Sequence, residues 1–313
     1  MLLYIGRRLL FGLVLALTVT FIVFWLLSFS IDSAMLSVLG STASAEGAEA
    51  LKASLGYDRP LLVQYFDWLA GIFTGDFGRS IYTGQTVAEG VLSRWSVTLS
   101  IVVVALFVTL VLSVTLGVWA ASRGGMVDRI VQGATMFGYV FPSLLLAIVL
   151  VYVFAIELRW LPATGFTPIG EDPQAWMQSI LIPVVVLTIA SIATLAAQVR
   201  GSMIDELRKD YVRTLRSRGI PARTVVLKFA LRGAAGPALT VLSLEFIAMF
   251  GGALIIERVF GLPGFGTYAF DAALRGDLPV ILGATVYSVL LVVIVNLLAD
   301  LANGWLNPKA RVH

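Results

Sequence analysis

Long, uninterrupted apolar runs dominate the pattern of hydrophobic and polar positions in this chain. A helix needs ~20 residues to cross a hydrocarbon core ~30 Å thick, so each run of that length predicts a membrane span. The runs lie at about 9–31, 98–121, 131–156, 178–199, 237–256 and 279–303. With 58% hydrophobic and 13% charged residues, the chain is more apolar than soluble domains are. The pattern predicts an all-α integral membrane protein with six transmembrane helices.

The lysines and arginines are divided unevenly between the segments that join these spans. Of the 22 basic residues, 15 lie in the N-terminus, the 122–130 loop, the 200–236 loop and the C-terminal tail with Lys309 and Arg311. The side of a membrane protein that is richer in basic residues is normally cytoplasmic. Both termini are therefore predicted to be cytoplasmic, and the net charge of +3 indicates topology rather than a nucleic-acid partner.

One large segment, about 32–97, is predicted to form an extracytoplasmic loop. The first span, followed by Ala43-Ser44-Ala45, could be mistaken for a cleaved signal peptide, but its apolar run is longer than ~7–15 residues, so a retained span is expected. Within the outer segment, LLVQYFDWLAGIF has apolar residues at helical spacing. It predicts a short helix, either lying at the membrane interface or acting as a lid.

Several kinds of chemistry are excluded by what the sequence lacks. The four lysines follow Leu, Arg, Leu and Pro, so no P-loop for ATP is present. The chain has no cysteine, and its one histidine is His313, which leaves neither a metal-ligand set nor a base for a nucleophile. The clear acids within the spans, Glu245 and Asp300, form no catalytic pair. We expect no catalytic residues, no metal and no cofactor in this chain.

The stretch DYVRTLRSRG, Asp210–Gly219, concentrates charge in the 200–236 loop. The fourth span is predicted to continue into it as one amphipathic helix, since an apolar residue recurs every fourth position at Val199, Met203, Leu207, Tyr211 and Leu215. Gly219 suits a left-handed helix end, and Pro221 suits the start of the next helix. Two interpretations remain open: an anchor for anionic lipid headgroups or a protein-docking surface.

Small residues and prolines inside the spans have two possible explanations. Gly117 and the pair Gly251-Gly252 are predicted to allow close approach of helices, and Pro142 and Pro183 to kink their helices. Ordinary packing explains each of them as well.

The sequence resembles the permeases of ABC importers, specifically the first permease subunit of the dipeptide/oligopeptide type. The resemblance rests on DYVRTLRSRG with KFALRGAAGPALTVL, and it extends to YIGRRLL, LGYDRPLLVQYFDWLAGIFTGDFGRSIYTGQTV, FPSLLLAIVL, GGALIIERVFGLPGFGTY and VNLLADLANGWLNPKAR. It thus runs almost from end to end. It implies one permease domain over 1–313 with the type I ABC importer fold, in a bacterial inner membrane.

The resemblance also implies partners. They are a second, homologous permease subunit, two ATPase subunits that bind ATP and Mg²⁺, and an extracytoplasmic solute-binding protein that delivers the peptide. The charged loop matches the helix that couples such permeases to the ATPase. The residues carried over to it are Asp210, Tyr211, Val212, Arg213, Thr214, Arg216, Arg218 and Gly219.

Two departures from the family pattern limit this transfer. The general permease pattern is Glu-Ala-Ala, three residues and Gly, whereas this chain has Arg213-Thr214-Leu215 before Gly219. A salt bridge expected from the Glu therefore cannot be assigned to Arg213. After the first span the chain reads SIDSAML instead of a P-G-D-P-like turn, so the outer entrance is expected to be built differently.

The translocation path is the least specified part of the hypothesis. Glu245 and Asn296, polar residues inside the fifth and sixth spans, are the candidates to line it. For Glu245, a helix–helix hydrogen bond and a solute contact remain equal alternatives. Nickel complexes, glutathione and oligosaccharides are alternative solutes, and an ATP-independent secondary transporter is the rival class.

Overall fold

The computed structural model describes residues 2–40 and 44–306, and within these ranges the regular structure is helical, with one isolated bridge between Arg79 and Thr86. Lys309, Arg311 and His313 lie outside the described residues, as does Ala43. The chain forms two compact units, one of Met1–Ser96 with Pro263–Ile294 and the other of Val97–Leu262 with Val295–His313.

The first unit is built around the first helix and the outer segment. Its helices are α1 (Leu2–Ser28), α2 (Ile31–Leu39), α3 (Ala45–Ser54), α4 (Leu61–Phe73), the start of α5 (Val87–Arg123), α12 (Phe265–Arg275) and most of α13 (Leu278–Leu306). Tyr65 of α4 packs against Phe24 of α1 and Leu282 of α13. Its hydroxyl donates to the Leu17 carbonyl at 3.1 Å. This aromatic contact fixes α4 against the first span.

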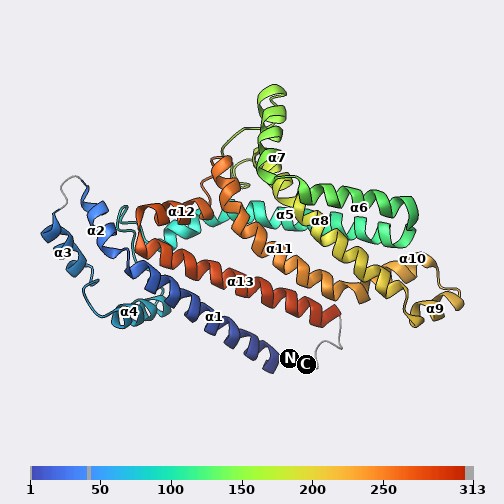
Figure 1. Ribbon diagram of the computed structural model, residues 1–313, viewed down its shortest axis with the longest axis horizontal. Coiled ribbons are helices and arrows are strands. Elements are labelled where there is room, and N and C mark those ends of the chain that lie inside the picture. Colours follow the sequence, from blue (N-terminus) through green and yellow to red (C-terminus); the bar gives the residue numbers. More distant parts are fainter. Residues whose placement is uncertain (1, 41–43, 307–313) are drawn as a thin grey trace. The chain divides into compact units, whose positions relative to one another are not determined.

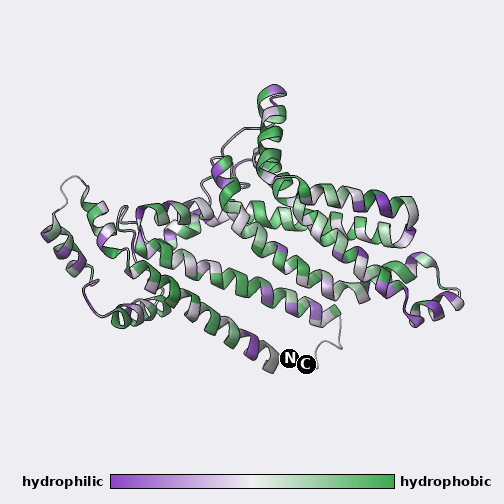
Figure 2. Cartoon of the chain, in the orientation of Figure 1, coloured by the Kyte–Doolittle hydropathy of each residue, from purple (hydrophilic) through white to green (hydrophobic). Residues whose placement is uncertain are grey.

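The second unit contains the remaining helices. They are most of α5, α6 (Gly125–Val140), α7 (Ser143–Leu150), the π-helix η2 (Val151–Glu157), α8 (Pro173–Leu207), α9 (Asp210–Ser217), α10 (Ala222–Thr224), the π-helix η3 (Val225–Ala230), α11 (Leu231–Val259) and the end of α13. Figure 1 shows α9 and α10 together beyond the C-terminal end of α8. Apolar residues cover the long helices, whereas hydrophilic residues gather on α9 (Figure 2).

The membrane spans agree with the predicted all-α architecture. Within residues 2–40 and 44–306, five helical segments are long and apolar enough to cross a bilayer: Gly6–Ser28, Val87–Arg123, Pro173–Leu207, Ala222–Val259 and Leu278–Leu306. A sixth span results only if α6, α7 and η2 are counted together. The prediction of six helices thus holds with one of them broken.

The break in the third predicted span lies at Phe141-Pro142. The two halves, Gly125–Val140 and Ser143–Glu157, are bent by 93°. Proline has no N–H to donate and pushes the preceding residue out of helical conformation, as the Phe141 angles of φ −77° and ψ 118° show. Pro142 therefore ends the helix rather than merely kinking it. Pro183, by contrast, lies within the uninterrupted helix α8.

The outer segment contains more helix than the sequence predicted. LLVQYFDWLAGIF forms α4, as predicted, and α2 and α3 precede it. While Tyr65 is buried, Phe66 and Phe73 of the same helix are 61% and 77% exposed. An apolar face left open on a helix is typical of a segment at a membrane interface.

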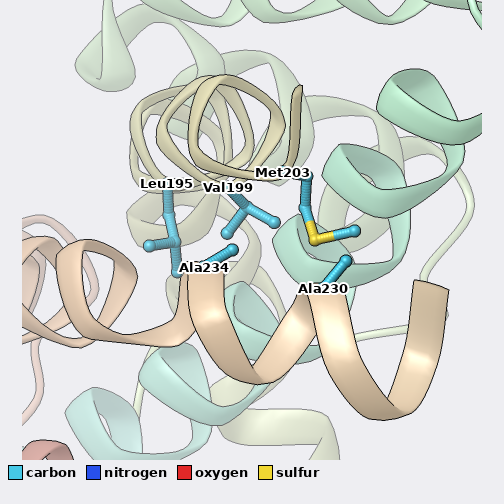
Figure 3. Close-up of a cluster of buried hydrophobic side chains, with 5 residues drawn as sticks. All are labelled: Leu195, Val199, Met203, Ala230 and Ala234. Atoms are coloured by element: carbon cyan, nitrogen blue, oxygen red, sulfur yellow. The ribbon is translucent and has the colours of Figure 1, made fainter. Parts of the chain in front are cut away.

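Close packing in the second unit depends on α8. A Cβ on Gly117 of α5 would lie 2.8 Å from Val199, so this glycine lets α5 approach α8 as predicted. The prediction was wrong for Gly251, where an added Cβ would meet no atom within 4 Å, and for Gly252, where it would make only ordinary contact with Leu187. In Figure 3, Leu195, Val199 and Met203 of α8 face Ala230 and Ala234, and all five are buried.

Candidate functional site

The candidate site is the corner at which α8 ends and α9 begins, on the side predicted to be cytoplasmic. The sequence predicted one continuous helix here, and this was wrong. Helix α8 ends at Leu207, Lys209 has extended backbone with φ −67° and ψ 149°, and α9 starts afresh at Asp210. The break shifts the buried face, so that Val212 is 1% exposed whereas Tyr211 is 38% exposed.

Glu206 holds this corner together. Its side chain is only 10% exposed, and it pairs with the Nζ atom of Lys209. The Tyr211 hydroxyl donates to its Oε1 atom at 2.8 Å. Burial, together with this hydrogen bond to Glu206, raises the pKa of the Tyr211 hydroxyl to about 12. The hydroxyl is therefore protonated at neutral pH and available as the donor.

Glycine on the neighbouring helix makes room for that carboxylate. A Cβ on Gly233 of α11 would lie 2.2 Å from Oε1 and 2.8 Å from Cγ of Glu206. Side chains do not approach this closely, so any residue other than glycine at this position would displace the Glu206 side chain. Through Glu206, the start of α9 is thus linked to the packing of α8 against α11.

The far end of α9 has the geometry that the sequence predicted. Gly219 has a φ of +75°, and its N–H donates to the Arg216 carbonyl at 3.0 Å. Pro221 precedes α10, and its carbonyl accepts from the N–H of Thr224. The left-handed glycine and the following proline therefore reverse the chain, as in a helix–break–helix.

The exposed face of α9 is charged. The side chains of Asp210 and Arg213 are 96% and 84% exposed, and their ion pair at 3.5 Å is too solvated to hold the helix in place. Thr214, Arg216 and Arg218 are exposed as well. Val212 and Glu206 therefore attach one face of α9 to the rest of the protein, and the opposite, basic face is exposed.

The two residues proposed for the translocation path lie on different helices of the second unit. Glu245 of α11 and Asn296 of α13 are both half-buried, and neither makes a hydrogen bond or ion pair with another described residue. Helices α11 and α13 come close at Gly236, whose added Cβ would lie 3.1 Å from Oδ1 of Asn303. If the helices run antiparallel from that point, Glu245 and Asn296 lie within about 3 Å of the same level.

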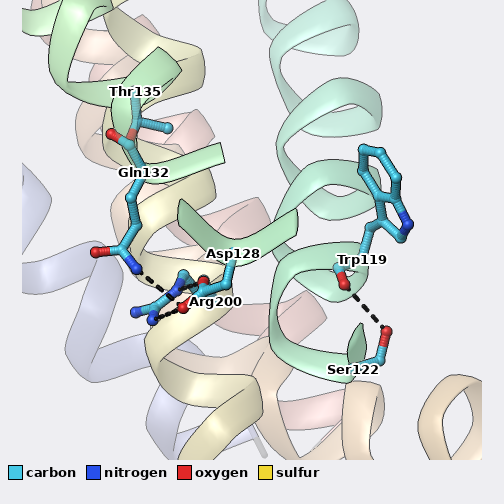
Figure 4. Close-up of polar contacts among 6 residues, drawn as sticks. All are labelled: Trp119, Ser122, Asp128, Gln132, Thr135 and Arg200. Atoms are coloured by element: carbon cyan, nitrogen blue, oxygen red, sulfur yellow. Dashed lines mark hydrogen bonds and ion pairs between the residues drawn. The ribbon is translucent and has the colours of Figure 1, made fainter. Parts of the chain in front are cut away.

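Two polar contacts between helices, one buried and one partly buried, escaped the sequence analysis. Glu257 is fully buried in α11, just beyond the predicted end of the fifth span, and accepts a hydrogen bond from the Thr98 hydroxyl. Asp128 of α6 and Arg200 of α8 form a two-pronged ion pair, with Nη2 to Oδ2 at 2.6 Å (Figure 4). Gln132 also donates to Asp128 at 2.9 Å. The one sequence signal for either contact was the charged pair Glu257-Arg258, which directly follows the fifth apolar run.

Comparison with protein-family models shows which family the chain belongs to. Residues 113–312 match the model of the binding-protein-dependent transport system inner membrane component, and residues 1–102 match the model of its N-terminal part. The chain belongs to this family of inner-membrane transport components. With its long apolar helices, it is a multi-pass inner-membrane permease. The expected permease family and inner-membrane location are confirmed.

Curated relatives of this permease match it over nearly its whole length. It is 34% identical over 309 residues to "Probable peptide ABC transporter permease protein y4tP" of Sinorhizobium fredii, covering 98% of this chain and 99% of that protein. It is 30% identical over 310 residues to "Oligopeptide transport system permease protein AppB" of Bacillus subtilis, covering 98% of each. The family match includes the whole of α9.

Proposed function

We propose that this chain is a permease subunit of an ATP-driven ABC importer and forms the translocation path for dipeptides or oligopeptides delivered by an extracytoplasmic binding protein. The family match and the names of both relatives support this function. The observation that carries it is α9, a short helix that is seated on its own protein by one face and open on its basic face. Such a helix suits docking to another subunit.

The energy source is proposed to lie on partner chains. The relatives are permeases rather than enzymes, and this sequence has no P-loop. ATP and Mg²⁺ would therefore be bound by two separate ATPase subunits. A second, homologous permease subunit would complete the path through the membrane.

Helix α9 would act as the coupling helix. A movement of α9 would displace Glu206, because Tyr211 of α9 donates a hydrogen bond to its carboxylate. Glu206 in turn is packed against Gly233 of α11. Displacement of α9 thereby shifts α8 relative to α11, which is the kind of rigid-body rearrangement that switches a transporter between two states. The residues in this role are Asp210, Tyr211, Val212, Arg213, Thr214, Arg216, Arg218 and Gly219.

Glu245 and Asn296 would contribute polar groups to the path. A carboxylate inside a membrane span is costly unless it meets water or a polar partner, and Glu245 has no such partner among the described residues. A peptide's ammonium group would supply one. Nickel complexes, glutathione and oligosaccharides remain alternative solutes, and an ATP-independent secondary transporter remains the alternative mechanism.

Co-purification and uptake test the proposal together. The tagged chain is expected to bring down an ATP-binding subunit, and vesicles with the complex are expected to take up radiolabelled dipeptide only with ATP and binding protein. Arg213→Glu combined with Arg218→Glu should weaken capture of the ATPase, because it reverses the exposed charge of α9. Arg129→Glu, an exposed change on the same side but outside α9, is the control. Uptake by this chain alone, without ATP, would favour the secondary transporter.

A further inference from the structure

A cavity of about 950 Å³ lies in the second unit beside α9. It is open on one side and is lined by the last turns of α5 and α8, by α9, α10 and η3, and by the start of α11. Four arginines line it: Arg123, Arg208, Arg216 and Arg223. None of the four guanidinium groups makes a hydrogen bond or ion pair with another described residue.

This grouping of exposed cations favours an anion as ligand. Four guanidinium groups around one cavity repel each other, and the described part of the chain supplies no carboxylate to offset them. The guanidinium group matches the oxygens of a phosphate with two parallel hydrogen bonds. The polar end of the cavity is therefore suited to a phosphate group.

Apart from Thr115 and Ser122, the rest of the cavity wall is apolar. Val114 and Val118 of α5 face it, as do Leu227 of η3 and Leu231 of α11. From Val114 to Arg123 the helix rises by roughly 13 Å. That rise is close to the thickness of one leaflet's hydrocarbon region, ~15 Å. A protein carboxylate would satisfy the arginines but would leave this apolar wall uncovered.

Trp119 marks the level of the membrane interface on the same wall. It lines the cavity, is 48% exposed, and lies one turn before Ser122, whose hydroxyl donates to its carbonyl (Figure 4). Tryptophan is enriched at the depth of the lipid headgroups. Arg123, one turn beyond Trp119 in α5, thus lies at headgroup depth, whereas Val114 and Val118 lie before Trp119, toward the depth of the acyl chains.

We propose that this cavity binds an anionic phospholipid of the cytoplasmic leaflet, with its phosphate among the four arginines and an acyl chain along Val114, Val118 and Leu231. The inner leaflet supplies such lipids and attracts basic side chains. Since Arg208 and Arg216 flank the start and end of α9, the lipid also braces that helix. This second consequence rests on the proposed coupling function, whereas binding of the lipid does not.

Native mass spectrometry of the purified full chain tests the binding. Phosphatidylglycerol is expected to remain bound, and phosphatidylcholine of the same acyl chains is not. Arg123→Gln with Arg223→Gln should weaken phosphatidylglycerol binding about 30-fold, equivalent to about 2 kcal/mol at ~1 kcal/mol per arginine. These two positions are outside α9, so the coupling helix keeps its own residues.

Matched variants distinguish the site from general surface charge and from misfolding. Arg7→Gln with Arg129→Gln removes the same net charge from exposed positions outside the cavity and should leave binding within about twofold of wild type. Arg123→Lys with Arg223→Lys keeps the charge and should retain most of the binding. Equal loss in both glutamine pairs, or equal retention of both lipids, would overturn the proposal.

Two further arms separate the other possible occupants. Deacylated glycerophosphoglycerol is expected to bind far more weakly than the whole lipid, and equal binding would show that the apolar wall has no role. Assembly with the ATPase subunits should leave the lipid bound. Its release on assembly would assign the cavity to an acidic segment of the ATPase and refute the lipid site. Failure of peptide uptake would leave all these outcomes unchanged.

Discussion

Replacing Gly233 by alanine should loosen α9 although the two lie on different helices. The new Cβ would be placed 2.2 Å from Oε1, 2.4 Å from Cδ and 2.8 Å from Cγ of Glu206. Rotating only the end of the carboxylate cannot relieve three contacts below 3.0 Å. The Glu206 side chain must therefore move, and it then loses the 2.8 Å hydrogen bond from Tyr211.

The size of the effect follows from two opposing terms. A hydrogen bond to a charged group contributes about 1.5–3 kcal/mol. Alanine regains up to ~1 kcal/mol of helix propensity over glycine. The remaining cost of about 0.5–2 kcal/mol corresponds to a 2- to 30-fold larger population of chains with α9 displaced. Gly251→Ala lies in the same helix and has open space around the added carbon, so it gains the helix propensity without losing a hydrogen bond.

Limited proteolysis measures that population. Trypsin in inside-out vesicles cleaves after the arginines of α9 only when the helix opens, so the cleavage rate should rise about 2- to 30-fold in Gly233→Ala and should not rise in Gly251→Ala. Tyr211→Phe removes the same hydrogen bond without crowding and should also accelerate cleavage. Wild-type rates in both Gly233→Ala and Tyr211→Phe would refute the role of Glu206.

Three other predictions follow from single contacts. Asp128→Asn and Arg200→Gln should each lower the melting temperature of the purified chain, because either change leaves one charge of the pair unmatched. The melting temperature of the double variant should fall by less than the sum of the two single decreases, and additive decreases would contradict the pair. Glu245→Gln should assemble normally yet slow uptake of peptides with a free amino terminus more than amino-blocked ones, and equal slowing would leave Glu245 as a packing residue. In this cysteine-free chain, a cysteine at Ser44 should react with an impermeant reagent in intact cells and one at Ser217 should not, whereas labelling of Ser217 would overturn the topology.

The apolar runs predicted where helices cross the membrane but not where they end. The second predicted span began at 98, whereas α5 begins at Val87. The fourth apolar run ended at about 199, and the helix was predicted to continue past it through Leu215, whereas α8 ends at Leu207. A hydropathy window detects the part of a helix that matches the bilayer thickness. Polar turns that extend the helix on either side carry no such signal.

Breaks in helices were predictable only where the cause is local. Pro142 forces the bend in the third span by its own covalent structure, and Gly219 ends α9 by its backbone freedom. The break at Arg208-Lys209 has no such residue. There, Lys209 and Tyr211 both turn back to Glu206, whose side chain lies against Gly233 of α11. No pattern within the loop encodes that packing.

Polar pairs between helices were not predictable for a related reason. The Asp128–Arg200 pair joins positions 72 residues apart, and the Thr98–Glu257 contact joins positions 159 residues apart. Each partner alone looks like an ordinary residue at a helix end. The burial of Glu257 at 0% exposure follows only from the way in which α5 and α11 meet.

The basic residues on the predicted cytoplasmic side therefore have different roles, although each counts equally in the topology prediction. Arg200 is committed to Asp128, and Lys209 is committed to Glu206, so both hold helices of the chain together. Arg123 and Arg223 line a cavity without a partner in the described part of the chain, and Arg213 is exposed on α9. Charge that is already paired cannot attract a ligand without breaking a native contact. Binding to lipid should therefore depend on the unpaired Arg123 and Arg223, and binding to another subunit on Arg213, whose exposed pair with Asp210 is weak. Substitution of Arg200 should lower the stability of the chain first, and should affect binding to either partner only as a consequence.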